Sequence, residues 1–179
     1  YDPDGFTPEK LQRLMAIRCQ NQGCVEDYAK EIGIQYVAGK RPWEVPVDVA
    51  LPCATQNELD AHDARVLLSN GVRCVAEGAN MPSTLEAVEL FLEAKILYAP
   101  GKASNAGGVA VSGLEMSQSS QRLFWTQEAV DQKLHQIMHA IHENCVQHGQ
   151  QAKFINYVDG ANIAGFVKVA DAILQQGVY

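Results

Sequence analysis

Apolar residues recur along this chain in two alternating patterns. Short apolar runs at 47–51, 72–76 and 96–99 are bounded by turn residues and predict buried strands. Between them, residues 58–69 and 83–94 carry apolar positions at helical spacing. Strands separated by single helices are typical of parallel sheets, so the pattern predicts an α/β fold with a doubly wound parallel sheet.

The N-terminal part predicts two helices and one further strand. Thr7 and Pro8 are typical of an N-cap and a first helical position, and helical spacing continues to about Arg18. Residues 25–32 predict a second helix, and the apolar residues at 34–37 predict a short strand after it.

After Gly101 the pattern predicts helices and no further strand. A segment rich in small residues at 104–120 precedes two expected helices, at 126–147 and 162–175. A helical tail after an α/β part indicates that the tail packs against the sheet or against another domain.

Composition limits the classes of partner. The chain has 179 residues with 14 Lys and Arg against 21 Asp and Glu, a net charge of −7 without a basic run. This acidic balance argues against a nucleic-acid or anionic membrane surface, and no apolar stretch approaches the roughly 18 residues of a bilayer span. Five cysteines, an odd number, favour reduced thiols and a cytoplasmic protein over a disulfide scaffold.

Three loops leave the carboxyl ends of the predicted strands, where open parallel sheets bind ligands. They span residues 52–57, 77–82 and 100–108 and are rich in small residues and carboxamides. Such loops offer backbone N–H groups and neutral hydrogen bonds to a polar ligand, although tight strand-to-helix turns use the same residue types.

The third loop leads into a candidate binding face. If the segment from Asn105 is helical, Asn105, Val109 and Ser112 lie at i, i+4 and i+7 and share one face. This face offers an amide, a methyl contact and a hydroxyl, and the small residues 106–108 would let a ligand approach the backbone closely.

Other motifs carry less information. His135, His139 and His142 share one helical stripe, which we interpret as a solvated flank rather than a metal site, so no metal is predicted. The sequence has neither a G-x-G-x-x-G fingerprint nor a P-loop. Nothing in it marks a nucleophile with a base beside it.

Several segments resemble hexameric bacterial glutamate dehydrogenases of the NADP-specific type. Together they cover nearly the whole chain, and they resemble only the carboxyl-terminal portion of that enzyme. The segments are Leu51–Leu59, Ala76–Pro82, Ala99–Val109, Ser112–Gln118 and Asn156–Phe166.

The resemblance implies an incomplete Rossmann-type, dinucleotide-binding domain at residues 1–120 and a helical carboxyl-terminal segment at residues 121–179. Asn105, Val109 and Ser112 match substrate-binding positions, with the Ser112 hydroxyl meeting the γ-carboxylate of glutamate. The implied cofactor-binding residues are Ala54, Thr55, Gln56, Asn57, Asn80 and Asn105.

The implied activity is reversible oxidative deamination of L-glutamate to 2-oxoglutarate and ammonium, with NADP favoured over NAD, in a homohexamer. The glycine fingerprint and the catalytic lysines of the family would precede Tyr1, so we expect no catalytic residue in this chain and no turnover by the chain alone. A leucine, valine or phenylalanine dehydrogenase of the same superfamily is an alternative, which the Ser112 hydroxyl disfavours because an apolar substrate would leave it unpaired. A non-catalytic nucleotide-binding or subunit-docking module is another.

Overall fold

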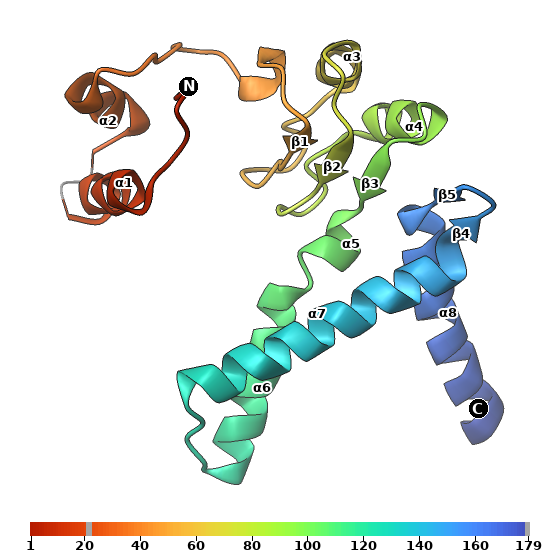
Figure 1. Ribbon diagram of the computed structural model, residues 1–179. Helices are drawn as coiled ribbons and strands as arrows, with labels where there is room; N and C mark the ends of the chain where they lie inside the picture. The colour runs from red at the N-terminus through yellow and green to blue at the C-terminus, as the bar shows by residue number, and fades with distance from the viewer. Residues whose placement is uncertain (21–22, 178–179) are drawn as a thin grey trace. The chain divides into compact units, whose positions relative to one another are not determined.

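The computed structural model describes residues 1–20 and 23–177, which form two compact units with a boundary between Pro42 and Trp43 (Figure 1). The first unit contains helices α1 (Pro8–Gln20) and α2 (Val25–Ile32). As predicted, α1 begins at Pro8, and the Thr7 side chain accepts a hydrogen bond from the Lys10 amide at 3.3 Å.

The strand predicted at 34–37 is wrong. Gly33 ends α2 in the left-handed region at φ 74°, and the Ile34 amide donates to the Ala29 carbonyl at 3.0 Å. This bond is part of the helix C-cap, so the first residue after Gly33 completes the helix instead of starting a sheet ladder. Tyr36 and Val37 then lie exposed, without a strand partner among the described residues.

The second unit is built around a three-stranded parallel sheet, with strands in sequence order and one helix in each connection (Figure 1). This arrangement confirms the predicted α/β fold. The elements are β1 (Val49–Ala50), α3 (Ala61–Ser69), β2 (Cys74–Ala76), α4 (Leu85–Glu93) and β3 (Leu97–Ala99).

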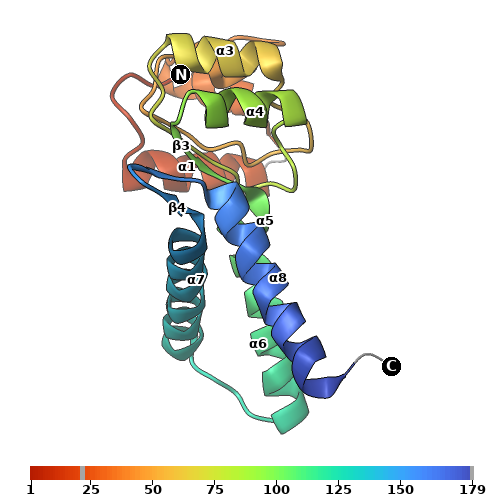
Figure 2. The ribbon, with the colours of Figure 1, turned by 90° about the vertical axis from the view of Figure 1, so that its right-hand side faces the viewer.

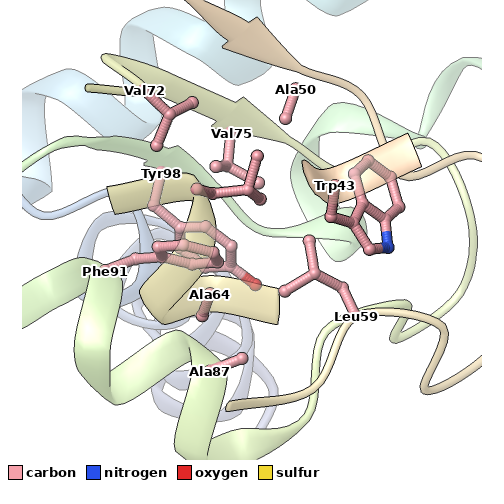
Figure 3. Close-up of a cluster of buried hydrophobic side chains, with 10 residues drawn as sticks. Trp43, Ala50, Leu59, Ala64, Val72, Val75, Ala87, Phe91 and Tyr98 are labelled. Carbon is pink, nitrogen blue, oxygen red and sulfur yellow. The ribbon is translucent and has the colours of Figure 1, made fainter. Parts of the chain in front are cut away.

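One face of the sheet carries the hydrophobic core. Ala50, Val75 and Tyr98 are in register across the three strands, and all are buried (Figure 3). The Tyr98 ring stacks on Phe91 of α4 with centroids 5.7 Å apart. The cluster also includes Trp43, Leu59, Ala64, Leu67, Val72 and Ala87, so α3 and α4 cover this face.

The opposite face is more open. Val49, Cys74 and Leu97 form the neighbouring register row, and Val49 and Leu97 are 52% and 49% exposed. A doubly wound sheet carries helices on both faces, so the described residues supply a complete helical layer on one face only.

Short polar side chains fix where the helices begin. Asp60 accepts hydrogen bonds from the His62 and Asp63 amides, and Thr84 caps α4. These caps place the starts two or three residues later than apolar spacing predicts.

The C-terminal part contains helices and a short hairpin, so the expectation of no strand after Gly101 is wrong. Two residues pair with two in antiparallel register, too few for a periodic pattern. The elements are α5 (Gly101–Ser104), α6 (Gly107–Gln121), α7 (Gln127–Gly149), β4 (Gln150–Gln151), β5 (Phe154–Ile155) and α8 (Tyr157–Gln176).

Helices α7 and α8 touch through their backbones where the hairpin joins them (Figure 2). A Cβ on Gly160 would overlap the Cys145 carbonyl oxygen, and one on Gly149 would overlap that of Asn156. Gly160 therefore lies inside α8 as a packing residue, and the helix begins five residues before the predicted Asn162. None of the described helices combines the length and apolar character that crossing a bilayer requires.

Candidate functional site

The three candidate loops meet at the carboxyl edge of the sheet, as the parallel topology requires. The Pro52 carbonyl oxygen of the first loop accepts hydrogen bonds from the Gly78 and Ala79 amides of the second, at 2.9 and 3.2 Å. Further along, the Asn57 amide donates to the Met81 carbonyl at 2.9 Å. The first two loops therefore form one hydrogen-bonded surface.

An open groove of about 450 Å³ lies between these two loops. Gly78 is required here, because a Cβ at this position would overlap the Cys53 sulfur. The lining residues are Cys53, Ala54, Thr55, Gln56, Gly78, Ala79 and Asn80. Four of the residues predicted to bind the cofactor therefore share one cavity.

Two residues at the end of the groove hold strained backbone conformations. Asn57 and Met81 have φ values of 55° and 49°, in the left-handed region that residues other than glycine rarely adopt. Their mutual hydrogen bond fixes both loops in this shape.

Two backbone amides of the first loop are already in use by a side chain. The Ala54 and Thr55 amides donate to Glu58 Oε1 at 2.8 and 3.4 Å. These two amides are therefore not available to a ligand, and the Glu58 carboxylate beside them disfavours a phosphate at the same place.

Asn105 connects the third loop to the second. Its Nδ2 group donates to the Ala79 carbonyl at 3.0 Å and to Asn80 Oδ1 at 2.9 Å. Among the described residues, this leaves Asn80 Nδ2 as a donor and Asn105 Oδ1 as an acceptor without partners. The pair therefore offers one donor and one acceptor, which matches a hydroxyl or carboxamide of a ligand.

The predicted i, i+4, i+7 face is interrupted. Asn105 is the C-cap of α5, and α6 begins only at Gly107, so Asn105 does not share one continuous helix with Val109 and Ser112. A Cβ at Gly107 would make only an ordinary contact with Leu134 of α7, at 3.4 Å, so the packing of α6 on α7 does not require a glycine there and its expected role toward a ligand stays a prediction.

Val109 and Ser112 lie in α6 with solvent-facing side chains. Val109 is 74% exposed, and the Ser112 hydroxyl donates to the Gly108 carbonyl at 3.2 Å. A hydroxyl that donates within its own helix keeps its lone pairs as acceptors and can rotate to donate to a ligand. Their roles in substrate binding stay predictions.

Glu77 is the residue that the sequence analysis missed. It follows β2 directly and is 5% exposed, with its carboxylate bonded to Ser83, Tyr98 and Gly101. Burial, together with the hydrogen bond to Glu77 and its charge, raises the pKa of Tyr98 above the ordinary value of a phenol. A single charged residue between an apolar strand and a loop of small residues was the available signal.

The three histidines of α7 have separate partners. His135 lies 3.6 Å from Asp131, His139 lies 3.5 Å from Glu143, and the His142 ring stacks on Tyr157. In the described part of the chain, no three metal-ligating side chains gather into a group that could hold an ion.

The polar groups of the groove suit a neutral polar ligand. Its polar groups are hydroxyls and carboxamides, its lining has no lysine or arginine, and the Asn80–Asn105 pair supplies a donor and an acceptor. Ribose hydroxyls and a carboxamide can use these groups, whereas a phosphate would need cations or unoccupied amides.

The family model for glutamate/leucine/phenylalanine/valine dehydrogenases matches residues 1–177. The chain is 64% identical over 177 residues to the NADP-specific glutamate dehydrogenase of Salmonella typhimurium, and 56% identical over 180 residues to the NAD-specific glutamate dehydrogenase of Bacteroides fragilis. Each match covers 99% of this chain and 40% of the relative, so the chain spans about two fifths of the length of these relatives.

A solved structure shows the same arrangement. The glutamate dehydrogenase of Plasmodium falciparum superposes with a TM-score of 0.92 at 44% identity, over 100% of this chain and 39% of that one. The whole chain therefore has a structural counterpart within that protein.

Proposed function

Because the chain belongs to the glutamate/leucine/phenylalanine/valine dehydrogenase family, we propose that it is the carboxyl-terminal, cofactor-binding portion of an NADP-dependent glutamate dehydrogenase. The complete protein would interconvert L-glutamate with 2-oxoglutarate and ammonium. The observation that carries this proposal is the 64% identity, across nearly the whole chain, to a relative named NADP-specific glutamate dehydrogenase.

In this proposal the groove holds the nicotinamide half of the cofactor. A bound nicotinamide supplies the hydride acceptor for oxidation of the substrate. The first loop, Ala54 to Asn57, lies along the dinucleotide, and Asn80 hydrogen-bonds the nicotinamide ribose. Asn105 orients Asn80 through the 2.9 Å bond between their side chains. We favour NADP over NAD because the identity is higher to the NADP-specific relative.

The substrate lies against α6 in the same proposal. Val109 supplies an apolar contact, and the Ser112 hydroxyl donates to the γ-carboxylate of glutamate. A leucine or valine side chain would leave this hydroxyl without a partner, which costs about 1–3 kcal/mol when the group is buried by the ligand. The hydroxyl therefore favours glutamate within the family.

The proposal also includes the domain boundaries that the resemblance to glutamate dehydrogenases implies. We propose that residues 1–120 belong to the dinucleotide-binding domain, and that residues 121–179 form a helical segment that docks on the remainder of the polypeptide. Ile163, Phe166 and Leu174 of α8 are 43%, 71% and 82% exposed, and α6 buries no residue. Exposed apolar faces mark interaction sites. More than half the length of the relatives lies outside the match, so the complete protein would have further chain to cover these faces.

Hydrogen exchange tests this docking. We expect residues 162–176 of α8 to exchange much more slowly in the complete protein than in the 179-residue chain. Helix α3, which already packs on the sheet, serves as the internal control and is expected to exchange alike in both. Equal exchange of α8 in the two forms would remove the proposed docking.

Assembly and location complete the proposal. We propose a homohexamer in the cytoplasm, and all five cysteines are free thiols, as a reducing compartment requires. Sedimentation of the complete protein tests the assembly.

The activity itself is tested by expressing the complete protein and measuring NADP reduction with glutamate, leucine, valine and phenylalanine. We expect turnover with glutamate only, and none from the 179-residue chain alone. Turnover with leucine instead would favour the branched-chain alternative. Absence of turnover with every substrate, in a protein that still binds NADP, would favour the non-catalytic module.

A further inference from the structure

Glu77 is buried in the second unit, at 5% exposure, and it is the one buried charged residue of that unit among the residues that the structure describes. It lies between β2 and the second loop of the groove. No lysine or arginine in the described part of the chain forms an ion pair with it. Burying a carboxylate whose oxygens have no partners would be costly. The hydrogen bonds that Glu77 makes must therefore offset the cost of removing its charge from water.

Every polar atom of Glu77 is hydrogen-bonded. Its amide donates to the Ala99 carbonyl at 3.1 Å, and its carbonyl accepts from the Ser104 hydroxyl at 2.5 Å. Carboxylate Oε1 accepts from the Tyr98 hydroxyl at 2.7 Å and from the Ser83 amide at 3.2 Å. Oε2 accepts from the Gly101 amide at 2.7 Å.

Four of these five bonds join Glu77 to residues of β3 or α5. Gly101 is the first residue of α5, whose N-cap position is Pro100 and provides no side-chain cap. Glu77 therefore caps α5 from the loop that follows β2. Gly101 leaves little room for adjustment, since a Cβ there would lie 2.8 Å from the Ala79 carbonyl oxygen.

Asn105 follows at the other end of this short helix. It is the C-cap of α5, and its amide contacts Ala79 and Asn80 in the second loop. Glu77 holds one end of α5 and the Asn105 amide holds the other, both against the same loop. The position of Asn80 in the groove thus depends on how α5 is held.

We infer that Glu77 is a positioning residue for cofactor binding: its carboxylate fixes α5 so that Asn105 orients Asn80 toward the nicotinamide half of the cofactor. This inference rests on the proposed function. Glu77 directly precedes the lining residue Gly78 but does not itself line the groove, so we place its action in the asparagine pair rather than in contact with the cofactor.

Glu77→Gln is the informative variant. The carboxylate accepts on both oxygens, whereas a carboxamide accepts on one and donates on the other. Whichever way the amide is turned, its NH₂ group faces a backbone N–H, of either Gly101 or Ser83. The variant keeps the volume of the side chain. It breaks either the hydrogen bond from Gly101, which caps α5, or the one from Ser83.

The experiment measures steady-state kinetics of the complete enzyme at saturating glutamate with varied NADP. We expect Glu77→Gln to raise the KM for NADP about ten- to a hundredfold, which is the effect of leaving one buried hydrogen-bond donor unsatisfied. We expect kcat at saturating NADP to change by less than about threefold. Tyr98→Phe removes one of the three bonds to the carboxylate, and we expect a rise in the same KM of about two- to fivefold.

Leu67→Ala is the matched control, because Leu67 lies in α3, is fully buried in the same core and is not one of the residues that line the groove. It lowers the thermal midpoint while leaving the KM for NADP at its wild-type value. If Glu77→Gln lowers the midpoint but moves this KM no more than Leu67→Ala does, the inference is overturned. If Glu77→Gln does not fold, an unchanged KM in Tyr98→Phe overturns it.

Failure of the proposed function looks different. In that case the wild-type complete protein itself gives no NADP reduction with glutamate, before any variant is compared. A working wild type with insensitive variants rejects only the role of Glu77.

Discussion

The Asn105 side chain donates to the Asn80 side chain at 2.9 Å, across the two loops that follow β2 and β3. The same Nδ2 group also donates to the Ala79 carbonyl, so both amide hydrogens are in use. Because the bond occupies Asn80 Oδ1, it leaves the Asn80 Nδ2 group to donate to a ligand.

Asn105→Asp should therefore weaken cofactor binding. A carboxylate cannot donate to the Ala79 and Asn80 oxygens, and it places a negative charge beside two acceptors. We expect the Kd for NADP, measured by calorimetry on the complete protein, to rise at least tenfold. Asn70→Asp is the control: Asn70 also donates to a backbone carbonyl, that of Glu44 at 3.2 Å, but lies outside the groove. Equal Kd values for the two variants would contradict the role of Asn105.

Ser112→Ala should mainly damage the use of glutamate. Loss of a hydroxyl that donates to a carboxylate costs about 1.5–3 kcal/mol, so kcat/KM for glutamate should fall about ten- to a hundredfold. Ser117→Ala is a close control on the same helix, because the Ser117 hydroxyl makes the same bond to the carbonyl four residues earlier, at 2.9 Å. A wild-type kcat/KM in Ser112→Ala would remove Ser112 from the substrate pocket.

Gly160→Ala should destabilise the contact of α7 with α8. The new Cβ would overlap the Cys145 carbonyl oxygen, and overpacking of this kind costs about 1–3 kcal/mol. Gly113→Ala should do the opposite, because it lies within α6 with open space around it, and alanine favours a helix by about 0.5–1 kcal/mol over glycine. Urea unfolding of the 179-residue chain measures both; a stabilised Gly160→Ala would show that the helices pack differently.

Asp27 should make the first unit sensitive to acid. The Cys24 amide donates to its carboxylate at 2.8 Å, and this hydrogen bond holds the pKa of Asp27 below its ordinary value. A folded-state pKa below the unfolded one stabilises the fold above the unfolded pKa of about 3.9, and this contribution is lost as pH falls through the folded value. Carbon NMR should give a lower titration midpoint for Asp27 in water than in urea. Asp27→Asn should show a flatter loss of helix below pH 4.

The sheet could be predicted from the sequence because its signal is local. Each strand is an apolar run between turn residues, and helical spacing marks the segment between each pair of strands, so the topology follows once the strands are parallel. The predictions that failed concerned strands, which depend on a pairing partner elsewhere in the chain or contain very few residues. Residues 34–37 are as apolar as a strand, but a strand needs a neighbour, and the Ile34 amide is used by the α2 cap.

The groove was predictable in place but not in detail. Loops after parallel strands converge by topology alone, so Ala54, Thr55, Gln56 and Asn80 could be brought together from the sequence. That Glu58 would occupy the amides of the first loop depends on side-chain reach, which no pattern encodes. The interruption between α5 and α6 at Asn105 could not be predicted either, because the residues on both sides of it are helical.

The burial of Trp43 gives this protein an internal fluorescence reporter. Of the two tryptophans in the sequence, Trp43 lies in the core at 7% exposure, and its indole Nε1 donates to the Glu58 carbonyl at 3.2 Å. Glu58 is the residue whose carboxylate holds the first loop of the groove. A ligand that shifts this loop changes the surroundings of a buried indole, so the emission maximum can follow occupancy without any attached label, against the background of Trp125 beneath Lys133.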